Sequence, residues 1–183
     1  MADPPIVCLT RFRTTVVPDN SSLRMPTIQC PMSIFPTLGD DFQALVDSLL
    51  SFAKSTISEN GSFNPFGAVM YPDGSIQWVA VDAGEEFPSS QVLIDGMTEI
   101  FKGMAESGGI RAATICFDAF AIPPGETLKV DVIGFALEAR SGNSISAYLP
   151  YKRREHEEVE CGELFTLERL PQFFAEPSTL NGS

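Results

Sequence analysis

The chain has 183 residues, 44% of them hydrophobic and 10% aromatic, and its formal net charge at pH 7 is −12. This length fits one domain, and the apolar content is sufficient for a core that needs no metal or disulfide support. The acidic charge repels phosphate backbones and anionic lipid, so nucleic acid and membrane surfaces are excluded as preferred partners, whereas a basic protein would be attracted.

Residues 1–39 differ in composition from the rest of the chain, because they are rich in proline, contain no lysine and show no sustained hydrophobic period. We predict that this segment is poorly ordered or loosely attached, with an edge strand over residues 8–17 as the alternative. A second interpretation is that translation starts at Met25 or Met32, which would leave residues 1–31 outside the native protein. Residues 40–170 are assigned to a single domain and residues 171–183 to a frayed C-terminal tail.

An amphipathic helix is predicted over residues 41–59. Asp40 would be its N-cap and Gln43 would complete a capping box, while Asn60 and Gly61 provide a left-handed stop signal. Its apolar residues recur with the period of one helix face: Phe42, Leu45, Val46, Leu49, Ala53 and Ile57. This stripe indicates a helix that covers a core.

A β-hairpin follows, with strands predicted over residues 66–70 and 75–82. The turn between them, residues 71–74, contains Pro-Asp-Gly, which is typical of a tight reversal. The preceding segment, residues 64–67, has the sequence Asn-Pro-Phe-Gly and is a candidate loop site. We favour the simpler interpretation, a stiff connection with its glycine at a crowded position.

A second helix is predicted over residues 90–106, capped by Ser89 or Ser90. Gly96 and Gly103 lie on the same side of it, and close packing against a sheet would explain both. The longest strand-like run comes next, residues 110–151.

This run predicts three strands separated by turns at residues 123–126 and 141–143. Apolar residues on both faces of these strands indicate a sheet that is covered on both sides. Residues 163–169 add either a last strand or a short helix.

Together these elements predict an α+β fold with a five-stranded, or six-stranded, antiparallel sheet and two main helices packed on it. The order, helix, two strands, helix, three strands, is similar to that of profilin, roadblock and longin modules. This similarity rests on element order, and function does not follow from fold.

Few residues suggest chemistry. His156 is the only histidine, so a catalytic pair with Cys161 or a metal site with Glu158 and Glu160 would have to use it. Neither arrangement has the spacing of a known zinc site or an orienting third group, and a solvated charge run explains His156 better.

Three other features of the sequence suggest chemistry only weakly. Asp118 and Asp131 would form a carboxylate pair on neighbouring strands, but solvent-facing strand positions explain them better. Residues 152–154, Lys-Arg-Arg, would grip an acidic partner, although the glutamates that follow offset their charge. Residues 108–109, Gly-Gly, close a helix instead of opening one, so they do not form a phosphate loop. We therefore assign no catalytic, cofactor-binding or metal residue, and no cofactor.

The remaining expectations concern setting and role. The four cysteines form no C-x-x-C pair, and the N-terminus lacks a signal-peptide pattern, so we expect a cytoplasmic protein. We expect a non-enzymatic binding or regulatory module with a basic protein partner, in the manner of an inhibitor or chaperone, or with a second copy as a homodimer. The alternative is an enzyme or small-ligand binder with a pocket between helix and sheet.

Overall fold

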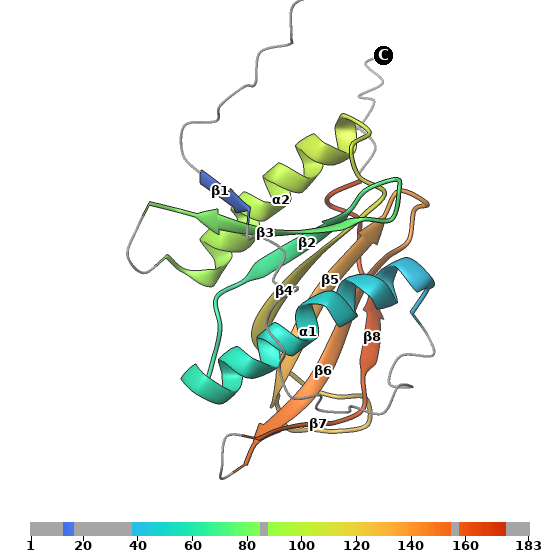
Figure 1. Ribbon diagram of the computed structural model, residues 1–183. Helices are drawn as coiled ribbons and strands as arrows, with labels where there is room; N and C mark the ends of the chain where they lie inside the picture. Colours follow the sequence, from blue (N-terminus) through green and yellow to red (C-terminus); the bar gives the residue numbers. More distant parts are fainter. Residues whose placement is uncertain (1–12, 17–37, 85–87, 155–157, 175–183) are drawn as a thin grey trace, which may run out of the picture.

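The computed structural model describes residues 13–16, 38–84, 88–154 and 158–174 (Figure 1). The elements, in chain order, are β1 (Arg13–Val16), α1 (Asp40–Asn60), β2 (Phe66–Met70), β3 (Ile76–Asp82), α2 (Ser90–Glu106), β4 (Ala112–Ala121), β5 (Val130–Ala139), β6 (Ser144–Arg153), β7 (Val159–Cys161) and β8 (Phe165–Glu168).

These strands form one antiparallel sheet in the order β1-β3-β2-β4-β5-β6, with β7 and β8 both paired to β6. The predicted α+β class and the antiparallel sheet are confirmed, but the sheet has eight strands instead of five or six. The strands beyond the predicted number are β1, which pairs with β3 as an edge strand, and the short β7. The last strand that residues 163–169 were expected to add, with a short helix as the alternative, is present as β8. The strand predicted as an alternative within residues 8–17 is therefore present at Arg13–Val16.

The two helices cover opposite faces of the sheet, and α1 crosses the face nearer the viewer in Figure 1. Along β2, Ala68 and Met70 pack in the cluster beneath α1, whereas Val69 between them packs in the cluster beneath α2. The same alternation continues along β4 and β5, where the α1-side residues are Ala112, Cys116, Phe135 and Leu137 and the α2-side residues are Ala113, Ile115 and Ala136. Because successive strand residues point to opposite faces, both faces must be apolar for two helices to pack.

Helix α1 begins one residue earlier than the sequence predicted. Gly39 is its N-cap and makes no side-chain capping bond, while Asp40 is already helical. The predicted capping box is wrong, because the side-chain amide of Gln43 instead donates a hydrogen bond to Asp47 Oδ1 at 2.8 Å. The predicted stop is confirmed, since Gly61 adopts a left-handed φ of 84°.

Helix α2 has the predicted boundaries. Ser89 is the N-cap, and its hydroxyl oxygen accepts a hydrogen bond from the backbone N–H of Val92 at 3.4 Å. At the other end Gly108 has a φ of 75°, and the N–H of Gly109 donates to the carbonyl of Met104 at 3.0 Å. These two glycines close a helix, as predicted.

Glycines allow close approach at only some of the predicted positions. A Cβ on Gly67 would lie 2.7 Å from the backbone oxygen of Thr114 and 2.8 Å from the ring of Phe101. This is the crowded position that the simpler interpretation of residues 64–67 expects. Gly96 is buried, but Gly103 is exposed and a Cβ there would meet nothing within 4 Å, so close packing does not explain Gly103.

A row of aromatic rings runs across four strands on the α2 side of the sheet. The register places Phe117, Gly134, Tyr148 and Phe165 next to one another on β4, β5, β6 and β8. The rings of Phe117 and Tyr148 are 6.4 Å apart, and those of Tyr148 and Phe165 are stacked at 5.3 Å. Gly134 provides the space for this row, because a Cβ there would collide with the ring of Phe117.

The segment after β8 returns to the sheet. Phe173 is only 2% exposed and its ring packs 5.3 Å from that of Phe101. The buried carboxylate of Glu138 accepts hydrogen bonds from the backbone N–H groups of Gln172, Phe173 and Phe174, at 2.6 to 3.3 Å. This part of the tail was expected to be frayed, but it is anchored because its backbone donors satisfy a buried charge.

Candidate functional site

The charge run after β6 yields no candidate site. His156 lies outside the described residues, so the pairing with Cys161 and the metal set with Glu158 and Glu160 stay without geometry. Within the described part of the chain, no group of three or more His, Cys, Asp or Glu side chains is placed to hold a metal ion.

The basic residues of this run are exposed at the end of β6. Lys152 lies opposite Glu160 in the β6–β7 register, and the guanidinium of Arg154 pairs with the same Glu160 carboxylate at 2.5 Å. Both partners of this ion pair are more than half exposed. The predicted offset of the basic charge by neighbouring glutamates is therefore present, and the run offers little net positive charge to an acidic partner.

Asp118 and Asp131, the possible carboxylate pair on neighbouring strands, lie on the α1 side of the sheet, near the turn that joins β4 to β5. Asp131 is exposed, as expected, whereas Asp118 is half-buried and its Oδ1 accepts a hydrogen bond from Tyr151 Oη at 3.0 Å. Burial raises the pKa of Asp118, the Tyr151 bond opposes that shift, and the charge of Asp131 adds to it. Burial of the Tyr151 hydroxyl raises the pKa of Tyr151, and the hydrogen bond to Asp118 and the charge of that carboxylate raise it further. Within the described residues, neither carboxylate forms an ion pair with a cation.

Large apolar side chains are exposed next to this pair. Phe120 is 70% exposed, Ile122 48% and Leu128 74%, and all three lie at the end of the β4–β5 hairpin. Asp118 and Phe120 are two residues apart in β4, so their side chains leave the same face of the strand, and Ile122 directly follows the last residue of β4. Phe120 lies directly opposite Asp131 in the register. We call Asp118, Phe120, Ile122, Leu128 and Asp131 the tip surface.

The end of this hairpin is stiffened by its sequence. Pro123 and Pro124 fix their own φ angles, and the N–H of Glu126 donates to the carbonyl of Pro123 at 3.0 Å, which closes a turn. Gly125 supplies the left-handed φ of 81° that this turn requires. The apolar side chains on either side of the turn are therefore presented in a defined arrangement.

Sequence reasoning did not select these apolar residues. Phe120 lies in β4, which carries apolar residues on both faces, and Ile122 directly follows it, so both resemble core positions in the sequence. The available signal was Leu128, which lies between polar residues in the connection and follows Pro-Pro-Gly-Glu-Thr. Isolated exposed apolar residues are normal, but several on one surface mark an interaction site.

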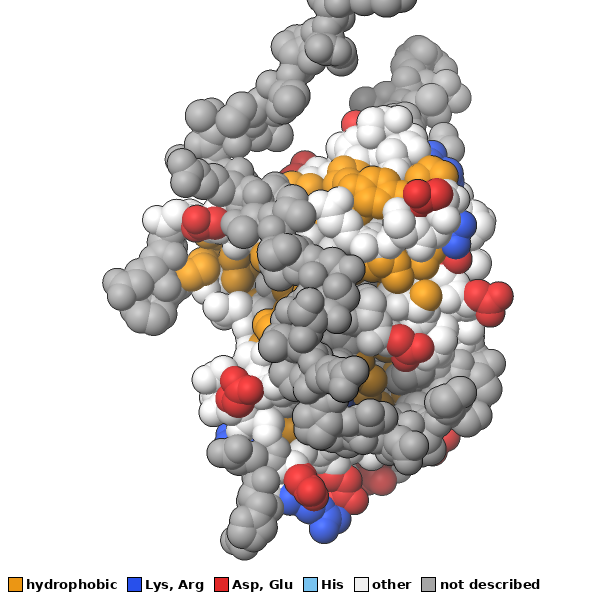
Figure 2. Space-filling view, viewed as in Figure 1, with side chains coloured by type: hydrophobic (Ala, Val, Ile, Leu, Met, Phe, Trp, Pro, Cys, Tyr) orange, Lys and Arg blue, Asp and Glu red, His pale blue; other side chains and the backbone are white. Residues whose placement is uncertain are grey.

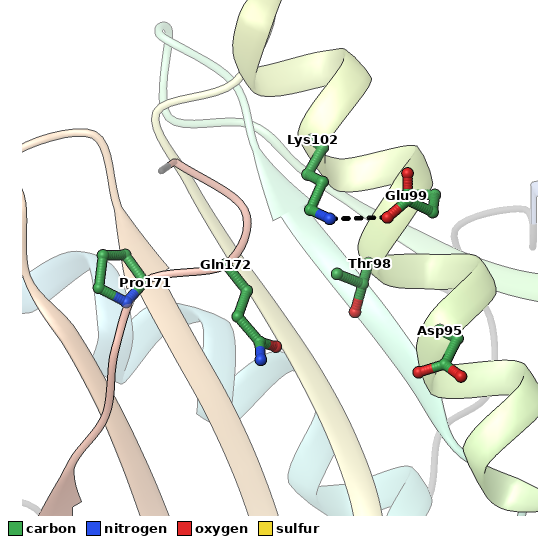
Figure 3. Close-up of a pocket in the computed structure, with 6 residues that line it drawn as sticks. All are labelled: Asp95, Thr98, Glu99, Lys102, Pro171 and Gln172. Atoms are coloured by element: carbon green, nitrogen blue, oxygen red, sulfur yellow. Dashed lines mark hydrogen bonds and ion pairs between the residues drawn. The ribbon is translucent and has the colours of Figure 1, made fainter. Parts of the chain in front are cut away.

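A hollow of about 440 Å³ lies beside α2 (Figure 3). It lies between the outer side of that helix and the C-terminal segment, and its lining residues are Asp95, Thr98, Glu99, Lys102, Pro171 and Gln172. Lys102 is paired with Glu99 at 2.7 Å, and both side chains are well exposed. An open hollow with a solvated ion pair lacks the enclosed apolar walls that ligand sites usually have.

The face of the molecule seen in Figure 2 carries both charged and apolar side chains. Figure 2 shows acidic side chains scattered over one face of the molecule, with hydrophobic side chains visible between them. None of the described helices is long and apolar enough to cross a membrane.

Comparison of the chain with protein-family models, with curated proteins and with solved structures gives no match. The fold and the tip surface therefore define the protein as an antiparallel α+β protein that exposes an acidic and apolar hairpin end.

Proposed function

We propose that this protein is a non-catalytic binding module that acts through contacts with a basic protein partner. The observation that carries the proposal is the tip surface, where three exposed apolar side chains lie beside two carboxylates that form no ion pair with a cation among the described residues. Apolar side chains supply affinity when water leaves them, and complementary charge supplies partner choice and a fast encounter.

The chemistry of the chain supports a basic partner over an acidic one. The formal net charge is −12, so a long-range attraction toward cationic surfaces is expected. An inhibitor or a chaperone that occupies a basic surface is the more specific form of this proposal.

Retention on the immobilised full-length protein tests the proposal. We expect a basic protein to be retained from cell extract at low ionic strength and released as salt is raised, because salt screens exposed charges. Retention of no basic protein at low ionic strength would contradict a basic partner.

The second candidate is a small-ligand binder or enzyme with a pocket between helix and sheet. The packing does not favour it, because Leu45 and Leu49 on the sheet-facing side of α1 and Phe101 on that of α2 are fully buried. The hollow beside α2 is the described feature that such a function would use. A thermal shift assay of Thr98→Trp against wild type, over a panel of small polar ligands, tests it: stabilisation of the wild type alone would support this candidate.

A further inference from the structure

We propose that the tip surface is the docking site for the partner, and that it takes an arginine or lysine side chain flanked by apolar residues. This inference rests on the proposed function and adds to it the place of binding and the chemistry of the bound segment.

The apolar part of the site is large enough to matter. The exposed portions of Phe120, Ile122 and Leu128 together amount to roughly 300 Å² of apolar surface, which is within the range of the largest patch on a typical monomer, and such patches are often functional. Other exposed apolar side chains lie away from this hairpin: Leu167 is on β8, which pairs with the beginning of β6, and Leu170 follows β8.

The charged part of the site selects a cation. Phe120 and Asp131 are direct cross-strand partners, and such pairs have Cα atoms about 4.5–5.5 Å apart. A guanidinium or ammonium group that lies over the ring of Phe120, within about 6 Å of its centre, is therefore also within reach of the Asp131 carboxylate. Asp118 is the diagonal neighbour of Asp131, at a typical Cα separation of about 7–8 Å, and adds a second negative charge.

Four cations of the described residues are engaged away from the tip surface. Among the described residues, Arg111 pairs with Asp41, Arg154 with Glu160, Lys102 with Glu99 and Arg169 with Glu138. The charged residues of the β4–β5 connection are Glu126 and Lys129, which offset each other. Arg153, at the end of β6, acts electrostatically on Tyr151, but among the described residues it forms no ion pair with Asp118 or Asp131. A cation from a partner would therefore meet a site that keeps its negative charge.

Charge also disfavours a second copy as the occupant. Two chains that each carry a net charge of −12 repel each other at low ionic strength. A basic segment instead gains attraction from the same charge. The stiff turn between Ile122 and Leu128 lowers the entropy that binding must overcome, because the apolar side chains need little reorganisation.

The test measures binding of a defined probe to full-length variants. The probe is a short fluorescein-labelled peptide of alternating arginine and leucine, and its Kd is measured by fluorescence anisotropy at low ionic strength. We expect Phe120→Ser with Leu128→Ser to raise the Kd about tenfold or more, as at other hot spots. The matched control is Leu167→Ser with Leu170→Ser, which removes exposed apolar side chains elsewhere and should change the Kd less than twofold. The fluorescence of Trp78, which packs near Phe52 and Phe66, reports whether each variant is folded.

The outcomes separate the site from the function. Equal Kd values for the wild type and the tip variant would overturn the site while leaving a basic partner in place. If the peptide fails to bind any variant at low ionic strength, the proposed function fails as well. A wild-type dimer in light scattering that the tip variant abolishes would identify a second copy as the occupant and overturn the proposal. Nuclear Overhauser contacts from the Phe120 ring to residues 1–37 in the free protein would identify that segment of the chain as the occupant of the tip surface, and would also overturn the proposal.

Discussion

Two groups of carboxylates in this protein have opposite surroundings. Glu138 is fully buried, and it accepts three backbone hydrogen bonds from the C-terminal segment and lies 3.4 Å from the guanidinium of Arg169. Asp131 is exposed and Asp118 is half-buried with one hydrogen bond, from Tyr151.

The comparison shows which charges the fold itself uses. A buried carboxylate must find all its partners within the chain, since an unsatisfied charge in the interior costs several kcal/mol. The partners of Glu138 are all internal, so its role is to hold the chain together. The carboxylates of the tip surface lie beside exposed apolar groups and lack a cation, so their role is open to an external partner.

The largest effect is expected for Glu138→Gln. The variant loses the charge that three backbone N–H groups and Arg169 stabilise, so we expect the free energy of unfolding to fall by about 3 kcal/mol. Urea titration followed by Trp78 fluorescence measures this change. Asp131→Asn, the matched removal of an exposed carboxylate, should leave the urea midpoint almost unchanged. Equal losses of stability in the two variants would show that the fold does not depend on Glu138 more than on Asp131.

A second comparison contrasts two glycines. Gly67→Ala places a methyl group against the backbone of Thr114 and the ring of Phe101, and we expect it to lower the free energy of unfolding by about 2 kcal/mol. Gly103→Ala lies on the exposed side of α2, where the methyl group meets nothing, and should raise it by up to about 1 kcal/mol. Thermal unfolding in a calorimeter compares the two, and a loss of stability in Gly103→Ala would show that this position is constrained.

Removal of one buried hydroxyl group is expected to stabilise the protein. Thr114 is fully buried in β4, and its Oγ1 has no hydrogen-bond partner among the described residues. Thr114→Val keeps the shape and removes the unsatisfied polar atom, so we expect about 1 kcal/mol of added stability in urea titration. Thr114→Ser, which keeps the hydroxyl and loses a methyl group, should be destabilised. A destabilised Thr114→Val would mean that the hydroxyl is in fact satisfied.

The tip surface should make stability depend on pH. The pKa of Asp118 is raised by burial in the folded protein, so the folded state binds this proton more tightly than the unfolded chain does. Stability from this group is therefore present at low pH and lost as the pH rises from the ordinary value of 3.8 through the raised value. Asp118→Asn keeps an oxygen for the Tyr151 bond and should be more stable than the wild type at pH 7. Urea titrations between pH 4 and 7 should show that the stability difference between Asp118→Asn and the wild type narrows toward low pH. A stability difference that does not change with pH would show that the raised pKa of Asp118 is not its cause.

The smallest effect on stability is expected for the tip surface itself. Phe120→Ser with Leu128→Ser removes mostly solvated side chains, so the free energy of unfolding should change by less than about 1 kcal/mol. A large loss in urea titration would show that these side chains belong to the core and not to an interaction site.

The sequence predicted the long elements because their signals are local. The apolar stripe of α1 and the left-handed glycines at Gly61, Gly74 and Gly108 lie within the segments that they define. The short strand β7 was not predicted, and residues 163–169 were left between a strand and a helix, because three or four residues show no clear period. The pairing of both short strands depends on β6.

The candidate site was harder to predict, since exposure depends on what covers a residue. Phe120 and Phe135 are both apolar strand residues, but only Phe135 has α1 above it. The role of Glu138 likewise depends on Gln172 and Phe173, more than thirty residues later in the chain.

A nuclear magnetic resonance titration of the isotope-labelled full-length protein with the arginine and leucine peptide tests directly whether the tip surface is the docking site. If the tip surface is the docking site, the largest chemical-shift changes will fall on the amides of Phe120, Ile122, Leu128 and Asp131, and they will diminish as salt is raised. Changes that instead centre on the α2 face around Asp95 and Glu99, or that spread evenly over all acidic residues, would contradict the account.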